Sequence, residues 1–153
     1  MLQPQWNKEE PVPITQITPD QARKILEESK DAVYLDVRST PEFANGHAAG
    51  AINIPLMNYN QGSGMMTPNP DFQQVVESVL PKGKKLVVGC QMGGRSQRAC
   101  ELMQQLGYQD LSNIRGGFGG SPEQPGWAQL GYPVSTEAGE GVGYESLLKK
   151  STK

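Results

Sequence analysis

The sequence predicts an α/β fold in which a central parallel sheet of about five short strands carries helices on both faces. Short and almost wholly apolar runs, such as 32–37 and 85–89, suit strands that are buried on both sides. Segments with helical spacing of apolar residues separate these runs, and this alternation is typical of parallel sheets. The chain of 153 residues is long enough to form one domain with its own core.

Capping signals set the expected element boundaries. Thr18-Pro19-Asp20 combines an N-cap residue, a proline in the first turn and an acidic side chain, and Asn69-Pro70-Asp71 repeats this pattern. In chain order, the predicted elements are a helix at 19–30, a strand at 32–37, a short helix at 40–45, a strand at 51–54, a helix at 70–80, a strand at 85–89, a helix at 95–106, a strand at 111–114 and a last short helix at 121–130.

The remaining segments lack periodic patterns. Residues 1–13 contain three prolines and are expected to form an irregular lead-in to a domain at 14–133. Residues 134–153 are rich in Thr, Glu, Gly and Ser, which favours a flexible C-terminal tail. Residues 57–68 are the longest interior stretch without a pattern, and they suit either a functional loop or a flexible surface connection.

Composition excludes several classes of function. The formal net charge of -2 gives no general attraction to nucleic acid or to anionic membranes, so neither partner is expected. Two cysteines and one histidine make a disulfide scaffold and a zinc site unlikely to form, and we expect no metal and no cofactor. Free thiols and a polar N-terminus without the apolar stretch of a signal peptide favour a reducing, cytoplasmic setting.

The loop Cys90–Ser96 carries the chemistry of this sequence. It places Cys90 at the C-terminal end of the strand at 85–89, where ligands bind in sheets of this kind. Gly93 and Gly94 let backbone amides approach an anion, and the start of the following helix favours a thiolate, which is a nucleophile. Arg95 can present several N–H donors to an oxyanion. Ser96 suits a helix cap or a hydrogen-bonding hydroxyl rather than a nucleophile.

Alternative roles exist for the other reactive side chains. Cys90 itself could be a small buried core residue, because free cysteines are commonly buried. Cys100 lies beside an apolar stripe of the following helix, which favours a core position over a resolving thiol. His47 follows a predicted helix end at Asn45-Gly46, and we favour a structural histidine over a general base.

Three separated motifs resemble those of rhodanese domains, the thiosulfate sulfurtransferase-like family. The first is Leu35-Asp36-Val37-Arg38 with Glu42-Phe43, and the second is the stretch from Gly46 to Pro55. The third is the loop Cys90-x-x-Gly93-x-Arg95-Ser96. The resemblance covers about residues 14–133 and implies a rhodanese-like fold.

The resemblance implies a sulfurtransferase of the EC 2.8.1 class. Cys90 would take a sulfane sulfur from a donor such as thiosulfate, form a persulfide and pass the sulfur to cyanide or a thiol, or to an acceptor protein. Arg95 would orient the sulfonate of the donor, and Arg38 and Glu42 would pair to brace the turn at Asp36. The implied site comprises the catalytic Cys90, the anion-binding loop of Gln91, Met92, Gly93, Gly94, Arg95 and Ser96, and the supporting residues Asp36, Arg38, Glu42 and His47.

Two alternatives remain beside this hypothesis. Cysteine phosphatases and arsenate reductases of related fold have five residues between cysteine and arginine, whereas four residues separate Cys90 from Arg95, which suits a sulfur atom better than a phosphate. A catalytically silent interaction module of the same fold would typically lack the cysteine. The family's usual tryptophan after Gly116-Gly117 is missing, because position 121 is Ser and Trp127 follows later, so the sequence leaves the pocket wall there undefined.

Overall fold

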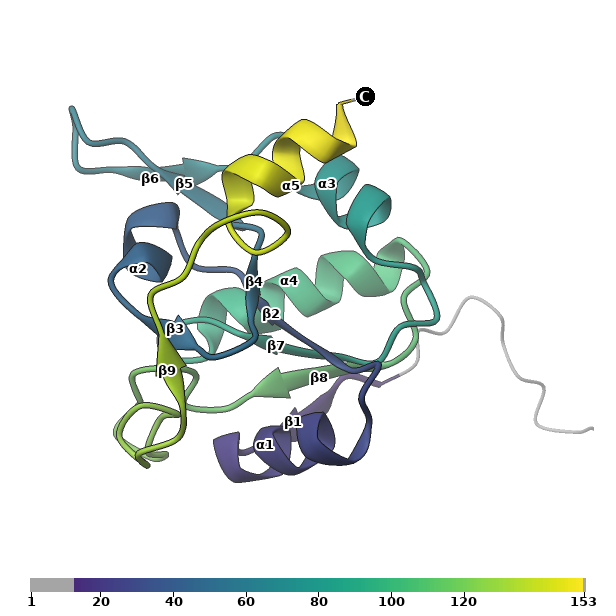
Figure 1. Cartoon of the computed structure of the whole chain (residues 1–153), viewed down its shortest axis with the longest axis vertical. Coiled ribbons are helices and arrows are strands. Elements are labelled where there is room, and N and C mark those ends of the chain that lie inside the picture. The colour runs from purple at the N-terminus through teal and green to yellow at the C-terminus, as the bar shows by residue number, and fades with distance from the viewer. Residues whose placement is uncertain (1–12, 153) are drawn as a thin grey trace, which may run out of the picture.

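The computed structural model describes residues 13–152, so the predicted lead-in at 1–13 lies outside the described residues except for Pro13. A five-stranded parallel sheet forms the centre of the molecule, with the strand order β1-β8-β7-β2-β4 (Figure 1). The strands are β1 (Thr15–Ile17), β2 (Val33–Asp36), β4 (Ile52–Asn53), β7 (Leu86–Gly89) and β8 (Leu111–Ile114). This architecture confirms the predicted fold class.

Helices cover both faces of the sheet, because successive side chains of the central strands point to opposite faces and both faces are apolar. Leu35 and Val88 face one buried cluster, whereas Tyr34 and Val87 face another. The first cluster lies beneath α3 (Phe72–Val79), α4 (Gly94–Gln105) and α5 (Tyr144–Ser151), and the second lies against α1 (Pro19–Glu28), as Figure 1 shows. The core therefore consists of two layers, one on each side of the sheet.

The predicted helix starts at Pro19 and Thr40 are confirmed, whereas the helix expected from residue 70 begins at Phe72 and Asp71 makes no side-chain capping hydrogen bond. The Thr18 side chain accepts a hydrogen bond from the Gln21 backbone N–H, and the Gln21 side chain accepts one from the Thr18 N–H, which forms a capping box at α1. Ser39 and Glu42 form a second capping box at α2 (Thr40–Ala44). Such local signals fix where a helix begins, and this position in turn places Glu42 at the start of α2.

Two segments are more ordered than the sequence indicated. β1 is a polar edge strand that pairs in parallel with β8, and its three residues are too few to show a period. The segment 57–68, which has no periodic pattern, is an antiparallel hairpin of β5 (Met57–Tyr59) and β6 (Met66–Pro68), and in Figure 1 it projects away from the body of the molecule.

The predicted short helix at 121–130 is wrong, because this segment folds as turns. Ser121 and Gln124 form an isolated bridge, and the backbone N–H of Trp127 donates to the carbonyl of Gly117. Pro125 has no N–H to donate, and Gly126 follows it directly, so a continuous helix across this point is disfavoured.

The C-terminal segment also differs from the flexible tail expected at 134–153. β9 (Val134–Ser135) pairs antiparallel with β3 (His47–Ala48), and α5 lies against α3 (Figure 1). Leu147 is buried in the core, and the side-chain amide of Asn69 donates to the Tyr144 hydroxyl at 3.0 Å. The tail is ordered because its few apolar residues recur at helical spacing and pack with the buried apolar residues of α3.

Candidate active site

Cys90 lies where the central strand β7 ends and α4 is about to begin. Its Sγ accepts a hydrogen bond from the Gly93 backbone N–H at 3.0 Å, and the Ser96 hydroxyl lies 3.5 Å away. Gly93 has a φ of +122°, which an L side chain rarely adopts, and this conformation turns its N–H back toward the sulfur. Only 2% of Cys90 is exposed, so the thiol lies at the bottom of its loop.

A second loop, residues 116–120, holds the backbone of the active-site loop from outside. The N–H groups of Phe118 and Gly119 donate to the carbonyls of Cys90 and Gln91 at 2.8 and 2.9 Å. Gly117 lies so close that a Cβ there would overlap the Cys90 carbonyl oxygen, and its φ is +53°. The carbonyls of Cys90 and Gln91 therefore form hydrogen bonds with this second loop and do not face the sulfur. The orientation of the active-site loop depends on the glycines after β8.

Asp36 and Arg38 support the loop from beneath. The Arg38 guanidinium forms an ion pair with Asp36 at 2.8 Å, and Asp36 also accepts the Arg38 backbone N–H at 3.0 Å. Arg38 donates further hydrogen bonds to the Gln91 side chain and the Gly46 carbonyl and lies over the ring of Phe118. Both charged groups are almost fully buried, and this network joins β2 to the active-site loop and to loop 116–120.

The predicted pairing of Arg38 with Glu42 is wrong. Glu42 instead forms a two-pronged ion pair with Arg95, with N···O distances of 2.7 and 2.9 Å. Burial alone would raise the pKa of Glu42, but hydrogen bonds from Arg95 and Ser39 outweigh it and lower this pKa to about 2. The hydrogen bond to Glu42 also raises the pKa of Arg95. Arg95 is thus a fixed, partly exposed cation at the edge of the loop.

Ser96 is fully buried and belongs to a hydrogen-bonded series that leads to β1. Its hydroxyl donates to the Asn113 side-chain oxygen at 2.5 Å, and the Asn113 amide donates to the Gln16 side chain at 2.9 Å. The same hydroxyl lies 3.1 Å from the Gly93 carbonyl. Ser96 therefore anchors the start of α4, and sequence reasoning missed Asn113 and Gln16 because they lie far from the loop in the chain.

His47 and Cys100 occupy structural positions. The His47 ring stacks on Phe43 and its Nδ1 lies 2.7 Å from the Phe43 carbonyl, so this nitrogen carries the proton that the carbonyl accepts. Cys100 is fully buried in the core, where burial and then the charge of Glu101 raise the pKa of its thiol to about 12. Because the His47 ring is held by the Phe43 carbonyl and the raised pKa of Cys100 keeps its thiol protonated, both positions fit the structural roles that the sequence favours.

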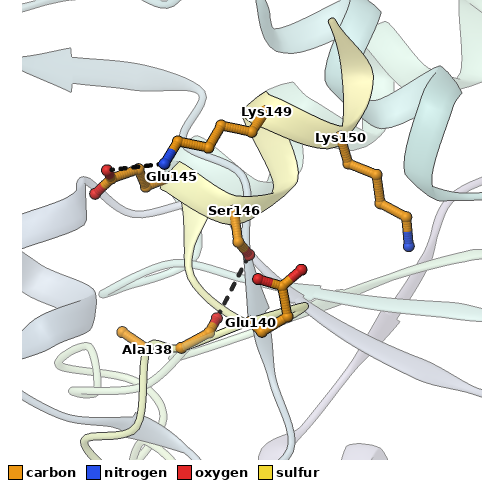
Figure 2. A pocket seen from close by; sticks show the side chains of 7 residues that line it. Ala138, Glu140, Glu145, Ser146, Lys149 and Lys150 are labelled. Atoms are coloured by element: carbon orange, nitrogen blue, oxygen red, sulfur yellow. Dashed lines mark hydrogen bonds and ion pairs between the residues drawn. The ribbon is translucent and has the colours of Figure 1, made fainter. Parts of the chain in front are cut away.

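Two surface hollows differ in their relation to the loop. A groove of about 650 Å³ begins at Gly94 and Arg95 and extends between α4 and the β5–β6 hairpin. The second hollow, shown in Figure 2, is lined only by residues of 138–150, with Glu145 pairing with Lys149 and the Ser146 hydroxyl 3.4 Å from the Gly139 carbonyl. Only the groove touches the candidate site.

Trp127 does not supply a wall to this groove. Its ring is buried in the cluster below α1, meets Tyr34 edge to face, and donates its Nε1–H to the Pro133 carbonyl at 2.7 Å.

Within residues 13–152, no group of three or more His, Cys, Asp or Glu side chains is placed to hold a metal ion. The same part of the chain has no helix with the length and apolar character needed to cross a bilayer.

A cysteine at the end of a parallel strand, with the Gly93 N–H directed at its sulfur and Arg95 at the edge of the same loop, is an arrangement typical of proteins that transfer a group through a cysteine. Comparison with known families makes this class specific. The family model of the rhodanese-like domain matches residues 18–120, and the chain belongs to this family.

Curated relatives and solved structures agree with this assignment. The chain is 42% identical to thiosulfate sulfurtransferase 16, chloroplastic, of Arabidopsis thaliana over 101 residues, which are 66% of this chain and 78% of the relative. It is 34% identical to thiosulfate sulfurtransferase 18 of the same plant over 130 residues, covering 83% and 88% of the two chains. The crystal structure of Rv0390 from M. tuberculosis superposes with a TM-score of 0.68 at 25% identity, over 80% of this chain and 98% of that one.

Proposed function

We propose that this protein is a sulfurtransferase that carries a sulfane sulfur as a persulfide on Cys90. The observation that carries the proposal is the Gly93 N–H that points at Cys90 Sγ from 3.0 Å, inside a loop whose carbonyls are bonded elsewhere. Such a donor stabilises an anionic sulfur, either the thiolate or the persulfide. Relatives named thiosulfate sulfurtransferase support the same class of reaction.

The reaction has two steps, and Cys90 Sγ is the nucleophile in the first and the leaving group in the second. In the first step, the Cys90 thiolate attacks the outer sulfur of thiosulfate, the S–S bond of the donor breaks, and sulfite leaves with the electron pair. In the second step, cyanide or an acceptor thiolate attacks the outer sulfur of the persulfide, and Cys90 leaves as the thiolate. Thiocyanate or the persulfide of the acceptor is the product, and no net oxidant is needed.

Arg95 is the group that we assign to the sulfonate of the donor. Glu42 occupies two of the five N–H donors of the guanidinium, so three remain for an oxyanion. The pair also fixes the orientation of the guanidinium before the donor arrives. We propose that the protein works in a reducing setting such as the cytoplasm, where Cys90 stays a free thiol.

The test compares the two cysteines by replacing each with alanine in a separate variant. Incubation with thiosulfate should add the mass of one sulfur atom to the intact protein. Cys90→Ala should abolish this addition, while Cys100→Ala should retain it, because Cys100 lies within α4 and burial raises the pKa of its thiol to about 12. Sulfur addition that survives in Cys90→Ala would contradict the mechanism.

The two alternatives have their own outcomes. A protein that neither accepts sulfur nor reacts with alkylating agents at Cys90 would be an interaction module. Cys90-dependent hydrolysis of p-nitrophenyl phosphate, or Cys90-dependent reduction of arsenate, would instead show the phosphatase or arsenate reductase chemistry that the loop length disfavours.

A further inference from the structure

A groove beside the active-site loop has one apolar wall and one basic end. It lies between the β5–β6 hairpin and α4, and its volume of about 650 Å³ is in the range of small-molecule sites. The apolar wall includes Met57, Met66, Phe72 and Leu102, and the basic end is formed by Arg95 and Arg98. Thiosulfate is small and doubly charged, and it has no apolar part that could pack against such a wall.

The groove opens close to the reactive sulfur. Gly94 lines the groove, and it directly follows Gly93, whose N–H lies 3.0 Å from Cys90 Sγ. Leu56 and Phe72, which also line the groove, belong to the same buried cluster as Cys90 and so lie on the same face of the sheet. Cys90 itself does not line the groove, which begins one residue beyond the Gly93 N–H that faces its sulfur.

The basic end carries one positive charge that is not compensated. The charge of Arg95 is balanced by the two-pronged pair with Glu42. Arg98, one helical turn further along α4, forms no recorded ion pair or hydrogen bond within the described part of the chain. A cation beside an apolar wall favours a ligand that has an apolar body and an anionic end.

We propose that this groove binds the sulfur acceptor, and that the acceptor is a small thiol with an aliphatic chain and a terminal carboxylate. This inference rests on the proposed sulfurtransferase function. The carboxylate pairs with Arg98, the chain lies on the apolar wall at Met66, and the thiolate faces the persulfide. Gly94 and Arg98 are about 6 Å apart along the helix axis, so the thiol and the carboxylate need several methylene groups between them.

The transfer is balanced without a further reagent. The acceptor thiolate forms a bond to the outer sulfur, the bond from that sulfur to Cys90 Sγ breaks, and Sγ takes the electron pair. The acceptor leaves as its own persulfide, and Cys90 returns to the thiolate that accepts the next sulfur.

The test separates loading from discharge. Protein is first loaded with thiosulfate and desalted, and the persulfide on Cys90 is measured by intact mass. It is then discharged with 6-mercaptohexanoate, with 6-mercaptohexanol, which has the chain without the charge, or with 3-mercaptopropionate, which has the charge on a shorter chain. The readout is the ratio of the hexanoate rate to the hexanol rate within each variant, so a general loss of activity cancels.

We expect 6-mercaptohexanoate to discharge the persulfide fastest of the three thiols. Arg98→Gln should lower the rate ratio about fivefold, as for the loss of one partly exposed ion pair. Lys30→Gln removes the same charge at an exposed position outside the groove and should leave the ratio unchanged. Met66→Gln, at a partly exposed position of the apolar wall, should slow both six-carbon thiols but not 3-mercaptopropionate.

Equal rates for the three thiols would overturn the inference, and so would an unchanged ratio of the hexanoate rate to the hexanol rate in Arg98→Gln. A protein acceptor would then be the remaining candidate for the groove. These results leave the proposed sulfurtransferase function intact. A failure to load sulfur from thiosulfate appears before any thiol is added, and it would overturn both the function and the acceptor site.

Discussion

The contact between loop 116–120 and the active-site loop gives the sharpest test of how the site is held. Gly117→Ala should damage this contact, because the added methyl group would overlap the Cys90 carbonyl oxygen and come within 2.9 Å of the Gln91 carbonyl oxygen. Neither obstacle is a flexible side-chain end, so the active-site loop itself has to move. The perturbation is a single methyl group that touches no substrate.

The expected magnitude follows from two contributions. An alanine at a φ of +53° costs roughly 1–2 kcal/mol relative to its ordinary conformations. The overlap with the carbonyl oxygen adds about 1–3 kcal/mol, as for other overpacked sites. Gly131→Ala provides the matched control, because Gly131 has a φ of +78° and no atom lies within 4 Å of the added carbon. The control therefore carries the backbone contribution without the overlap.

Two measurements distinguish these contributions. Urea unfolding should show Gly117→Ala as less stable than Gly131→Ala by about 1–3 kcal/mol. The rate of persulfide formation from thiosulfate should fall at least about tenfold in Gly117→Ala, since a displacement of about 1 Å at a reacting centre costs up to about a hundredfold. If Gly117→Ala loads sulfur at the rate of Gly131→Ala, loop 116–120 does not position Cys90.

Two further predictions concern stability. Glu42→Gln should lower the free energy of unfolding at pH 7 by about 1–2 kcal/mol, since the ion pair with Arg95 is two-pronged but partly exposed. Because folding lowers the pKa of Glu42 from its ordinary 4.5 to about 2, this stabilisation is present above pH 4.5 and is lost as the pH falls toward 2. Urea midpoints for both proteins should thus converge across that interval, and a constant difference would refute the assignment. Leu147→Ala should cost about 2–5 kcal/mol because Leu147 is buried in the core, whereas the exposed Lys150→Ala should have little effect. A negligible loss in Leu147→Ala would mean that α5 does not contribute to the core.

Local signals allowed most of the central fold to be predicted. The strands at 32–37 and 85–89 are apolar except for Asp36 and Lys85, and the capping residues at Thr18 fix the start of α1. The position of Cys90 follows from the same reasoning, because a strand, two glycines and a helix start are all adjacent in the chain. These elements depend on residues within a few positions of each other.

The errors arise where a partner distant in the chain decides the structure. The three residues of β1 have no pattern of their own, and they form a strand only because β8 offers an edge. The polar segment around α5 has a stripe of three apolar residues that gains stability only from α3. The flexible tail expected at 134–153 rests on composition, which reports how a segment behaves alone rather than what it packs against.

The misassigned ion pair has the same origin. The resemblance implied a pair between Arg38 and Glu42, but Asp36 lies two positions from Arg38 and occupies its guanidinium instead. Glu42 then faces Arg95, 53 positions along the chain. The two arginines consequently have separate tasks, since Arg38 supports the loop from beneath and Arg95 stands at its partly exposed edge.

The burial of Cys90 sets what each step of the proposed reaction can admit. With 2% of the residue exposed, the thiolate is reached only by a donor that presents a single terminal sulfur atom, as thiosulfate does. Once that sulfur is bound, the reactive atom lies one bond further out than Sγ. An acceptor therefore meets the outer sulfur without entering the loop, and it can be larger than the donor. The donor must therefore be small, whereas the acceptor can be larger. This difference explains why the groove at Gly94 and Arg98 would select the acceptor, while Arg95 binds the donor.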